Sequence, residues 1–117
     1  MKIEWTSYKG KRILRVDYSG LNEQQMIAQL EQGTKVILNE KEKILYLGNF
    51  TETVVTSTFM DKANALAKQT DEKLIKGAIV GVTGMKSVLL NTYNMLTGSK
   101  MKSFKTEAEA LEYLVKA

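Results

Sequence analysis

The sequence predicts an α/β fold: a four- to five-stranded, mostly parallel sheet with an N-terminal β-hairpin, covered by about four helices. Short apolar segments bounded by charge or glycine alternate with segments whose apolar residues recur at helical spacing. Strands that alternate with helices of about 10 to 18 residues require right-handed crossovers, which make neighbouring strands parallel. The 117 residues include no proline, no internal repeat and no low-complexity stretch. We therefore expect residues 1–117 to form a single domain.

The N-terminal part predicts a hairpin followed by a helix. Residues 3–7 alternate between apolar and polar, a glycine-containing turn follows, and residues 12–18 resume the strand pattern. This pattern is typical of a β-hairpin, which adds one antiparallel neighbour to the sheet. Asn22 with Gln25 three residues later predicts a capped helix start, and apolar residues at helical spacing continue to about Asn39.

The middle of the chain predicts two buried strands separated by a helix. Residues 43–48 form a short apolar run between charge and glycine, which is typical of a strand buried on both faces. One apolar stripe predicts a helix over residues 53–69, with Thr51 or Thr53 as its N-cap. Residues 77–82 form the next buried strand.

The C-terminal third predicts two more helices and an edge strand. Thr83-Gly84 opens a third helix, which Gly98 ends. Residues 102–105 form a short edge strand. Thr106 and Glu109 then form a capping box for a final helix.

The residue types present exclude much of ordinary enzyme chemistry. The sequence has no cysteine and no histidine, so thiol nucleophiles, Ser-His-Asp triads, imidazole bases, thiolate zinc sites and disulfides are excluded. Most acids fall in first turns of helices or on exposed faces, where no catalytic pair converges. Asp17, near the end of a central strand, is the exception, and such an aspartate is typically a cap or turn partner. We expect no enzyme activity, no metal site and no cofactor.

The distribution of charge is more informative than its total. Seventeen basic and thirteen acidic residues give a net charge of +4, which is mild for a protein surface. Residues 73–106, however, hold six lysines and no acid. This stretch is either a solvated lysine face or a patch for an anionic partner. It contains no arginine, and its aromatics are not interleaved with the lysines, so we do not expect nucleic-acid binding.

The N-terminus does not resemble a targeting segment. Its residues are charged and are not followed by a cleavable apolar stretch. The longest apolar runs have only a few residues, whereas a membrane-spanning helix needs about 20. We expect a cytoplasmic protein with no membrane span.

Four sequence segments, together with the order of elements, resemble those of a known family. They are residues 15–21 (RVDYSGL), 44–51 (ILYLGNFT), 78–84 (AIVGVTG) and 104–114 (FKTEAEALEYL), which extend nearly from end to end. In this joint order the chain resembles the SpoIIAA-like (STAS/SEC14-type) small bacterial proteins. The resemblance implies a four- or five-stranded sheet with packed helices, and a role in binding or regulation without catalysis.

The resemblance also implies where a functional loop lies. In anti-sigma-factor antagonists a serine that follows the central strand is phosphorylated by a partner kinase. The matching segment here is Asn49-Phe50-Thr51-Glu52-Thr53, which lacks the serine motif. SpoIIAA-like members often have Asp-Phe-Thr at this place, so Asn49 replaces an acid. The resemblance therefore implies a docking loop without the usual serine phospho-switch.

Two strand-to-helix loops are candidate sites. The first contains Asn49, Phe50, Thr51 and Thr53, with Asp17 nearby, and its threonines are helix caps, a partner or ligand surface, or sites of phosphorylation. The second, residues 81–87, resembles a phosphate-binding loop, but Met85 and Val80 stand where that motif needs glycines. It is either a weak anion site or tight helix-to-strand packing, and its candidate residues are Gly84, Lys86 and Ser87.

Two functions of different classes fit these features. The favoured one is a non-enzymatic regulatory or interaction module that docks a protein partner through about Asn49 to Phe59. The alternative is a carrier that binds a lipid or other anionic amphiphile between the helices. A protruding Phe50 on a flat surface would favour docking, and a deep apolar pocket would favour carriage. Apolar residues beside the buried helix stripes also make a homodimer possible.

Overall fold

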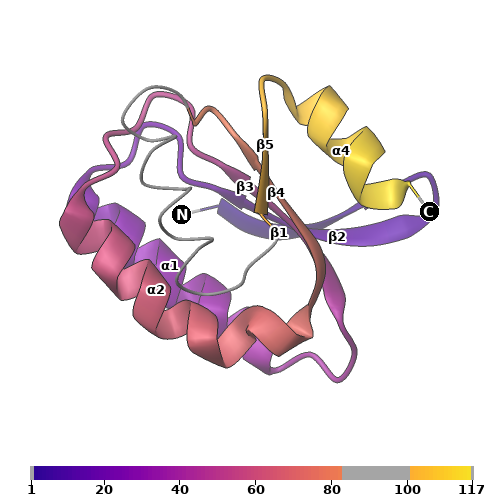
Figure 1. Cartoon of the computed structure of the whole chain (residues 1–117), viewed down its shortest axis with the longest axis horizontal. Helices are drawn as coiled ribbons and strands as arrows, with labels where there is room; N and C mark the ends of the chain where they lie inside the picture. The colour runs from indigo at the N-terminus through magenta and orange to yellow at the C-terminus, as the bar shows by residue number, and fades with distance from the viewer. Residues whose placement is uncertain (1, 83–100, 117) are drawn as a thin grey trace.

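A computed structural model describes residues 2–82 and 101–116 and confirms the predicted α/β fold. Its five-stranded sheet has the spatial order β1-β2-β3-β4-β5 (Figure 1). β1 is antiparallel to β2, and the remaining neighbours are parallel. The strand bounds are β1 Lys2–Tyr8, β2 Lys11–Asp17, β3 Ile44–Asn49, β4 Leu74–Val80 and β5 Met101–Phe104.

The described helices cover both faces of the sheet. α1 (Glu23–Leu38) and α2 (Ser57–Thr70) lie side by side on one face, and α4 (Glu107–Val115) lies on the other (Figure 1). A short 3₁₀ turn, Asp71–Lys73, joins α2 to β4. The predicted third helix, residues 83–98, lies outside the described residues.

The central strands are apolar in succession because each is buried on both faces, as predicted for parallel strands. In β3, Ile44 and Tyr46 pack toward α1 and α2, whereas Leu45 and Leu47 pack toward α4. The neighbouring strands follow the same alternation. Two separate apolar clusters therefore hold the helices on the sheet and fix the position of the loops between them.

Local capping signals place two helix starts as predicted. The Asn22 side chain accepts from the Gln25 N–H, and the Gln25 side chain accepts from the Asn22 N–H, which completes a capping box. At α4 the Thr106 hydroxyl accepts from the Glu109 N–H.

The predicted start of α2 is wrong by about one turn. The helix begins at Ser57, and its N-cap is Thr56, whose side chain accepts from the Phe59 N–H. Thr53 is instead buried and donates its hydroxyl to the Phe50 carbonyl. The reason is tertiary, because Phe50 and Phe59 are both buried beneath this loop and the chain needs several non-helical residues to bring them together.

Candidate functional site

The candidate site lies at the carboxyl ends of β2 and β3. Asp17 and Asn49 are partners in the parallel register there, as the sequence predicts. The Tyr18 N–H donates to the Asn49 carbonyl at 2.8 Å, and the Phe50 N–H donates to the Val80 carbonyl at 2.7 Å. The backbone ladder therefore continues past the strand ends and fixes where the loop begins.

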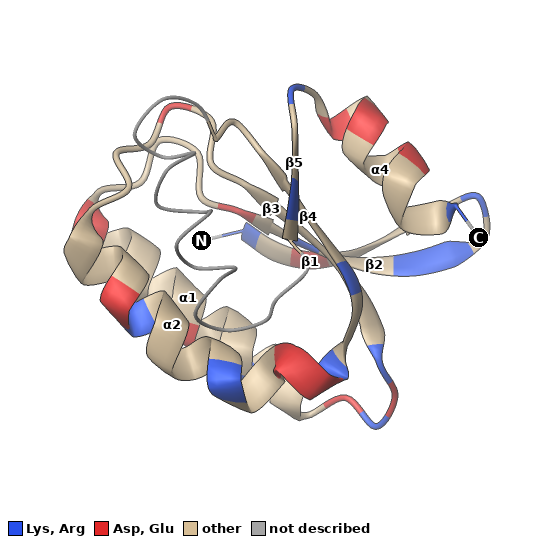
Figure 2. Cartoon of the chain, in the orientation of Figure 1, with Lys and Arg blue, Asp and Glu red and all other residues tan. Residues whose placement is uncertain are grey.

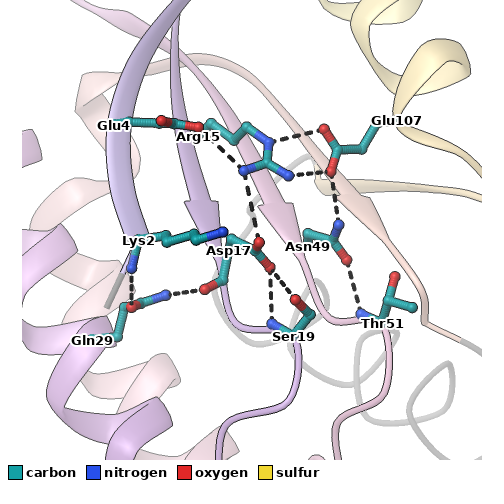
Figure 3. A network of polar contacts seen from close by, with 9 residues as sticks. All are labelled: Lys2, Glu4, Arg15, Asp17, Ser19, Gln29, Asn49, Thr51 and Glu107. Carbon is teal, nitrogen blue, oxygen red and sulfur yellow. Dashed lines mark hydrogen bonds and ion pairs between the residues drawn. The ribbon is translucent and has the colours of Figure 1, made fainter.

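The side chain of Asn49 joins this loop to α4. Its Nδ2 donates to the Glu107 carboxylate at 2.8 Å, and its Oδ1 accepts from the Thr51 N–H at 2.9 Å (Figure 3). An aspartate at this position could accept from Thr51 but could not donate to Glu107. The neighbouring carboxylate therefore explains why an amide suits this position.

Arg15 and Glu107 form the centre of the polar network, and the sequence did not identify either as a site residue. The guanidinium donates through Nε and one Nη to the two carboxylate oxygens of Glu107, a two-pronged ion pair (Figure 3). Another Nη lies 3.3 Å from Glu4 and 3.8 Å from Asp17. These contacts raise the pKa of Arg15, with the Glu107 hydrogen bond as the main cause.

The Glu107 carboxylate is held in its charged form. The hydrogen bond from Arg15 lowers its pKa, burial opposes this effect, and the Asn49 amide lowers the pKa further. A carboxylate with a lowered pKa is a weak base, so this group is poorly suited to general-base catalysis at neutral pH.

Asp17 is a turn partner, as the sequence favours. Its Oδ1 accepts from the Ser19 hydroxyl at 2.6 Å and from the Ser19 N–H at 2.9 Å. Burial raises the pKa of Asp17, but the two Ser19 hydrogen bonds and the charges of Arg15 and Lys2 outweigh burial, so the pKa is lowered overall. The Asp17 backbone carbonyl also accepts from the buried Gln29 side chain, which ties α1 to this end of β2.

Phe50 does not protrude from the surface. Its side chain is 7% exposed, stacks on Tyr18 with ring centroids 4.5 Å apart, and meets Phe59 edge-on at 5.9 Å. Tyr18 and Phe59 are also edge-on at 5.9 Å. Burial of so large an aromatic surface is favourable, so a docking surface formed by Phe50 itself is excluded.

The exposed part of the loop lies beyond Phe50. Thr51 and Glu52 are exposed, and Glu52 has a positive φ of 56°. Val54 is 78% exposed, the highest value among the exposed large apolar side chains of the described residues. The helix start that follows is also exposed at Ser57 and Thr58. The loop therefore presents hydroxyls and one aliphatic side chain on a buried aromatic base.

Gly81, at the end of β4, packs directly against this loop. Its φ is +85°, and a Cβ atom added there would lie 2.5 Å from the Thr51 nitrogen. Only glycine accommodates both the backbone conformation and the close approach. Contacts from β3, β4, α2 and α4 therefore all meet at residues 49–59.

An apolar cavity of about 70 Å³ adjoins the aromatic cluster. Its lining includes the three aromatic rings of Tyr18, Phe50 and Phe59, together with Val55 of the loop and Met60 of α2. Drug-sized ligands typically occupy about 300 to 1,000 Å³. The cavity is therefore apolar, as a carrier site requires, but far smaller than a lipid.

Comparison with known structures decides the fold. No protein-family model matches the sequence, and no curated protein matches it. Among solved structures, the chain is similar to an uncharacterised protein from the DUF3478 family with a SpoIIAA-like fold from Shewanella loihica PV-4. The TM-score is 0.61 at 18% identity over 97% of this chain and 92% of that chain. The chain has a SpoIIAA-like fold.

A second structure with this fold class is an anti-sigma-factor antagonist (STAS) domain protein from Planctomyces limnophilus. It aligns with a TM-score of 0.50 at 14% identity, over 97% of each chain. These similarities confirm the predicted resemblance at the level of fold.

Three residues of the second candidate loop, Gly84, Lys86 and Ser87, lie outside the described residues. Within residues 2–82 and 101–116, no three or more carboxylates gather as metal ligands would. The same part of the chain contains no helix long and apolar enough to cross a membrane.

The sequence contains only a weak signal that Arg15 and Glu107 form a pair. Arg15 interrupts the apolar run Ile13-Leu14-Arg15-Val16, and a charge within a buried strand normally has a partner. Glu107 falls in the predicted first turn of the final helix, and 92 residues separate it from Arg15. Only the packing of α4 across the sheet brings the two together.

Proposed function

We propose that this protein is a non-enzymatic regulatory module that binds a protein partner through the docking loop, defined as residues 49–59. The observation that carries the proposal is Val54, 78% exposed on a loop whose two ends are anchored by buried aromatic rings. Burial of this aliphatic side chain against a partner would contribute favourable free energy that Val54 lacks in the isolated chain. The fold shared with an anti-sigma-factor antagonist domain protein supports a regulatory role.

The rigid support of the docking loop favours binding. Asn49 fixes the Thr51 N–H, Thr53 fixes the Phe50 carbonyl, and Thr56 caps α2. A surface ordered before binding loses less conformational entropy on association than a flexible one. Asp17 at the end of β2 and Glu107 at the start of α4 are both hydrogen-bonded, and both have lowered pKa values, which supports a binding role without catalysis.

Site-specific photo-cross-linking in the native cell tests the proposal. A photoreactive amino acid at Val54 should yield one reproducible cross-linked protein. The same group at Gln69, on the exposed far end of α2, is the matched control and should not yield it. Thr51→Glu should abolish the cross-link while leaving the melting temperature unchanged, because it adds charge at an exposed position. Equal cross-linking from positions 54 and 69 would reject the docking loop.

Small-ligand carriage is a second candidate, favoured by the apolar cavity beside Phe50 and Phe59. A lipid or amphiphile would have to displace the cavity walls, because a volume of about 70 Å³ is several times smaller than the roughly 300 to 1,000 Å³ of a typical ligand pocket. Native mass spectrometry of gently purified protein tests this function. A reproducible non-protein adduct would support carriage, and the same spectrum reports whether the chain forms a homodimer.

A further inference from the structure

The opposite end of the sheet from the docking loop holds an open groove of about 650 Å³. It lies at the amino ends of β2, β3 and β4 and is bordered by the loop between α1 and β3. Its apolar wall includes Trp5 and Ile75, and its basic rim includes Lys11, Arg12, Lys41 and Lys43. None of these residues was a candidate in the sequence.

A β-bulge directs Ile75 outward. In the parallel register Ile44 pairs with Leu74 and Leu45 pairs with Lys76, so Ile75 is an extra residue in β4. Ile75 is 57% exposed. Bulges commonly re-aim one side chain, and an exposed isoleucine gains nothing from burial in the isolated chain. The bulge therefore displays an aliphatic side chain that is available to a partner.

Trp5 is held in place beside this position. The Arg12 guanidinium carbon lies 3.5 Å from the centroid of the indole ring, a close cation–π contact. Arg12 is itself fixed by an ion pair with Glu40 at 2.8 Å, and Lys73 donates to the Glu40 carbonyl at 2.6 Å. The indole and the loop are therefore ordered before any ligand binds.

The rim of the groove is basic overall. Lys11, Arg12, Lys41 and Lys43 are opposed by Glu40 and Glu42, which leaves a net charge of +2. Figure 2 shows both signs of charge in the loop between α1 and β3. Arg12 is already paired with Glu40, whereas Lys11, Lys41 and Lys43 make no ion pair with any other described residue.

We propose that this groove binds an acidic segment of a partner protein, with an aliphatic or aromatic side chain between Trp5 and Ile75 and carboxylates on the lysine rim. Charge complementarity selects an acidic occupant. A nucleic acid fits less well, because Glu40 and Glu42 would face its phosphates and Arg12 already covers the indole on which a base would stack. The inference does not depend on the docking loop.

Intrinsic fluorescence tests the proposal directly, because Trp5 is the only tryptophan in the sequence. The probe is a twelve-residue peptide of glutamates with interspersed leucines, and the matched peptide carries glutamine in place of every glutamate. The acidic peptide should change Trp5 emission saturably, and added salt should weaken its binding. The glutamine peptide should bind at least about fivefold more weakly.

Variants of the full chain complete the test. Ile75→Asp should weaken binding of the acidic peptide at least about tenfold, because it replaces the apolar contact with a charge of the same sign as the peptide. Combined Lys41→Glu and Lys43→Glu should weaken it at least about fivefold. Val54→Asp is the matched control, since it changes an exposed aliphatic residue of the docking loop, and it should leave peptide affinity unchanged.

Several outcomes would overturn the proposal. Equal affinity for both peptides, no saturable change up to about 1 mM, or an unchanged affinity in Ile75→Asp would each reject an acidic occupant. A Trp5 response to anionic phospholipid vesicles in place of the peptide would assign the groove to a membrane surface. Self-association that is lost in Ile75→Asp would assign it to a second copy of the chain. The groove is tested by peptide binding and the docking loop by cross-linking at position 54, so one proposal can fail while the other stands.

Discussion

Replacement of Glu107 by glutamine should destabilise the protein measurably, because this residue ties α4 to the sheet. The carboxylate accepts from Arg15 and Asn49 together, and a glutamine offers one acceptor oxygen in place of two. The Arg15 and Glu107 side chains are 20% and 30% exposed, so the pair is intermediate between a surface and a buried ion pair.

The magnitude follows from that intermediate burial. Loss of one partner of a fully buried pair costs about 3 to 5 kcal/mol, and a surface pair contributes about 0 to 1 kcal/mol. Arg15 also keeps its contacts with Glu4 and Asp17 in the variant. We therefore expect Glu107→Gln to lower the free energy of unfolding by about 2 kcal/mol, or the melting temperature by roughly 8 °C at this chain length.

Urea denaturation at neutral pH, monitored by circular dichroism, measures this loss. Glu112→Gln is the matched control on the same helix, because Glu112 pairs with Lys9 and Tyr8 at an exposed site, and its effect should be much smaller. Equal stability of Glu107→Gln and the wild type would refute the ion-pair reasoning. A double-mutant cycle with Arg15→Met would show the coupling directly.

The same comparison has a predictable pH dependence. The folded-state pKa of Glu107 lies below its ordinary value of 4.5, so its stabilisation is fully present above pH 4.5 and is lost as pH falls through the folded pKa. The difference in stability between the wild type and Glu107→Gln should therefore shrink below pH 4.5. Asp17 is present in both the wild type and Glu107→Gln, so its lowered pKa affects the pH dependence of stability in both proteins. A difference that stays constant down to pH 2 would contradict the charged state assigned to Glu107.

Three further predictions concern the docking loop and its supports. Gly81→Ala should lower the free energy of unfolding by at least about 2 kcal/mol, because its new methyl group meets the Thr51 backbone in a positive-φ conformation. Gly10→Ala, with φ of +79° and open space around it, should lower it by about half as much. Equal melting temperatures for the two variants would contradict the close contact between Gly81 and Thr51. Thr56→Ala should lower the free energy of unfolding by about 1 kcal/mol, because it removes an N-cap, whereas Thr51→Ala should lower it by less than about 0.5 kcal/mol. A larger loss for Thr51→Ala than for Thr56→Ala in urea denaturation would support the earlier helix start that the sequence predicts. Phe50→Ala should cost about 3 to 4 kcal/mol by opening a cavity beside Tyr18 and Phe59, and a calorimetric loss below about 1 kcal/mol would mean that Phe50 is not part of the core.

Part of the candidate site follows from the sequence. The alternation of strand and helix patterns predicts the parallel sheet, and the ends of residues 12–18 and 43–48 then bring Asp17 beside Asn49. Asp17 was correctly predicted to be a turn partner, because Asx side chains bond to the backbone two residues later. The caps at Asn22 and Thr106 are equally local.

The remaining features depend on tertiary packing. Thr51, Thr53 and Thr56 have similar capping propensities, and the burial of the aromatic rings below the loop selects Thr56. Phe50 turns inward for the same reason, although its place in a strand-to-helix loop is equally compatible with exposure. The alternation of apolar residues cannot reveal the bulge that displays Ile75, because a bulge is defined by the register with a neighbouring strand.

The sequence by itself determined the class of fold, the order of the described strands and helices, and the N-caps of α1 and α4, since these depend on patterns within short stretches of the chain. Tertiary structure decided which polar groups meet. Arg15 and Glu107 pair across 92 residues, and Trp5 meets the loop after α1 through Arg12 and Glu40. Such pairs depend on how helices pack across the sheet, and no local pattern records that geometry.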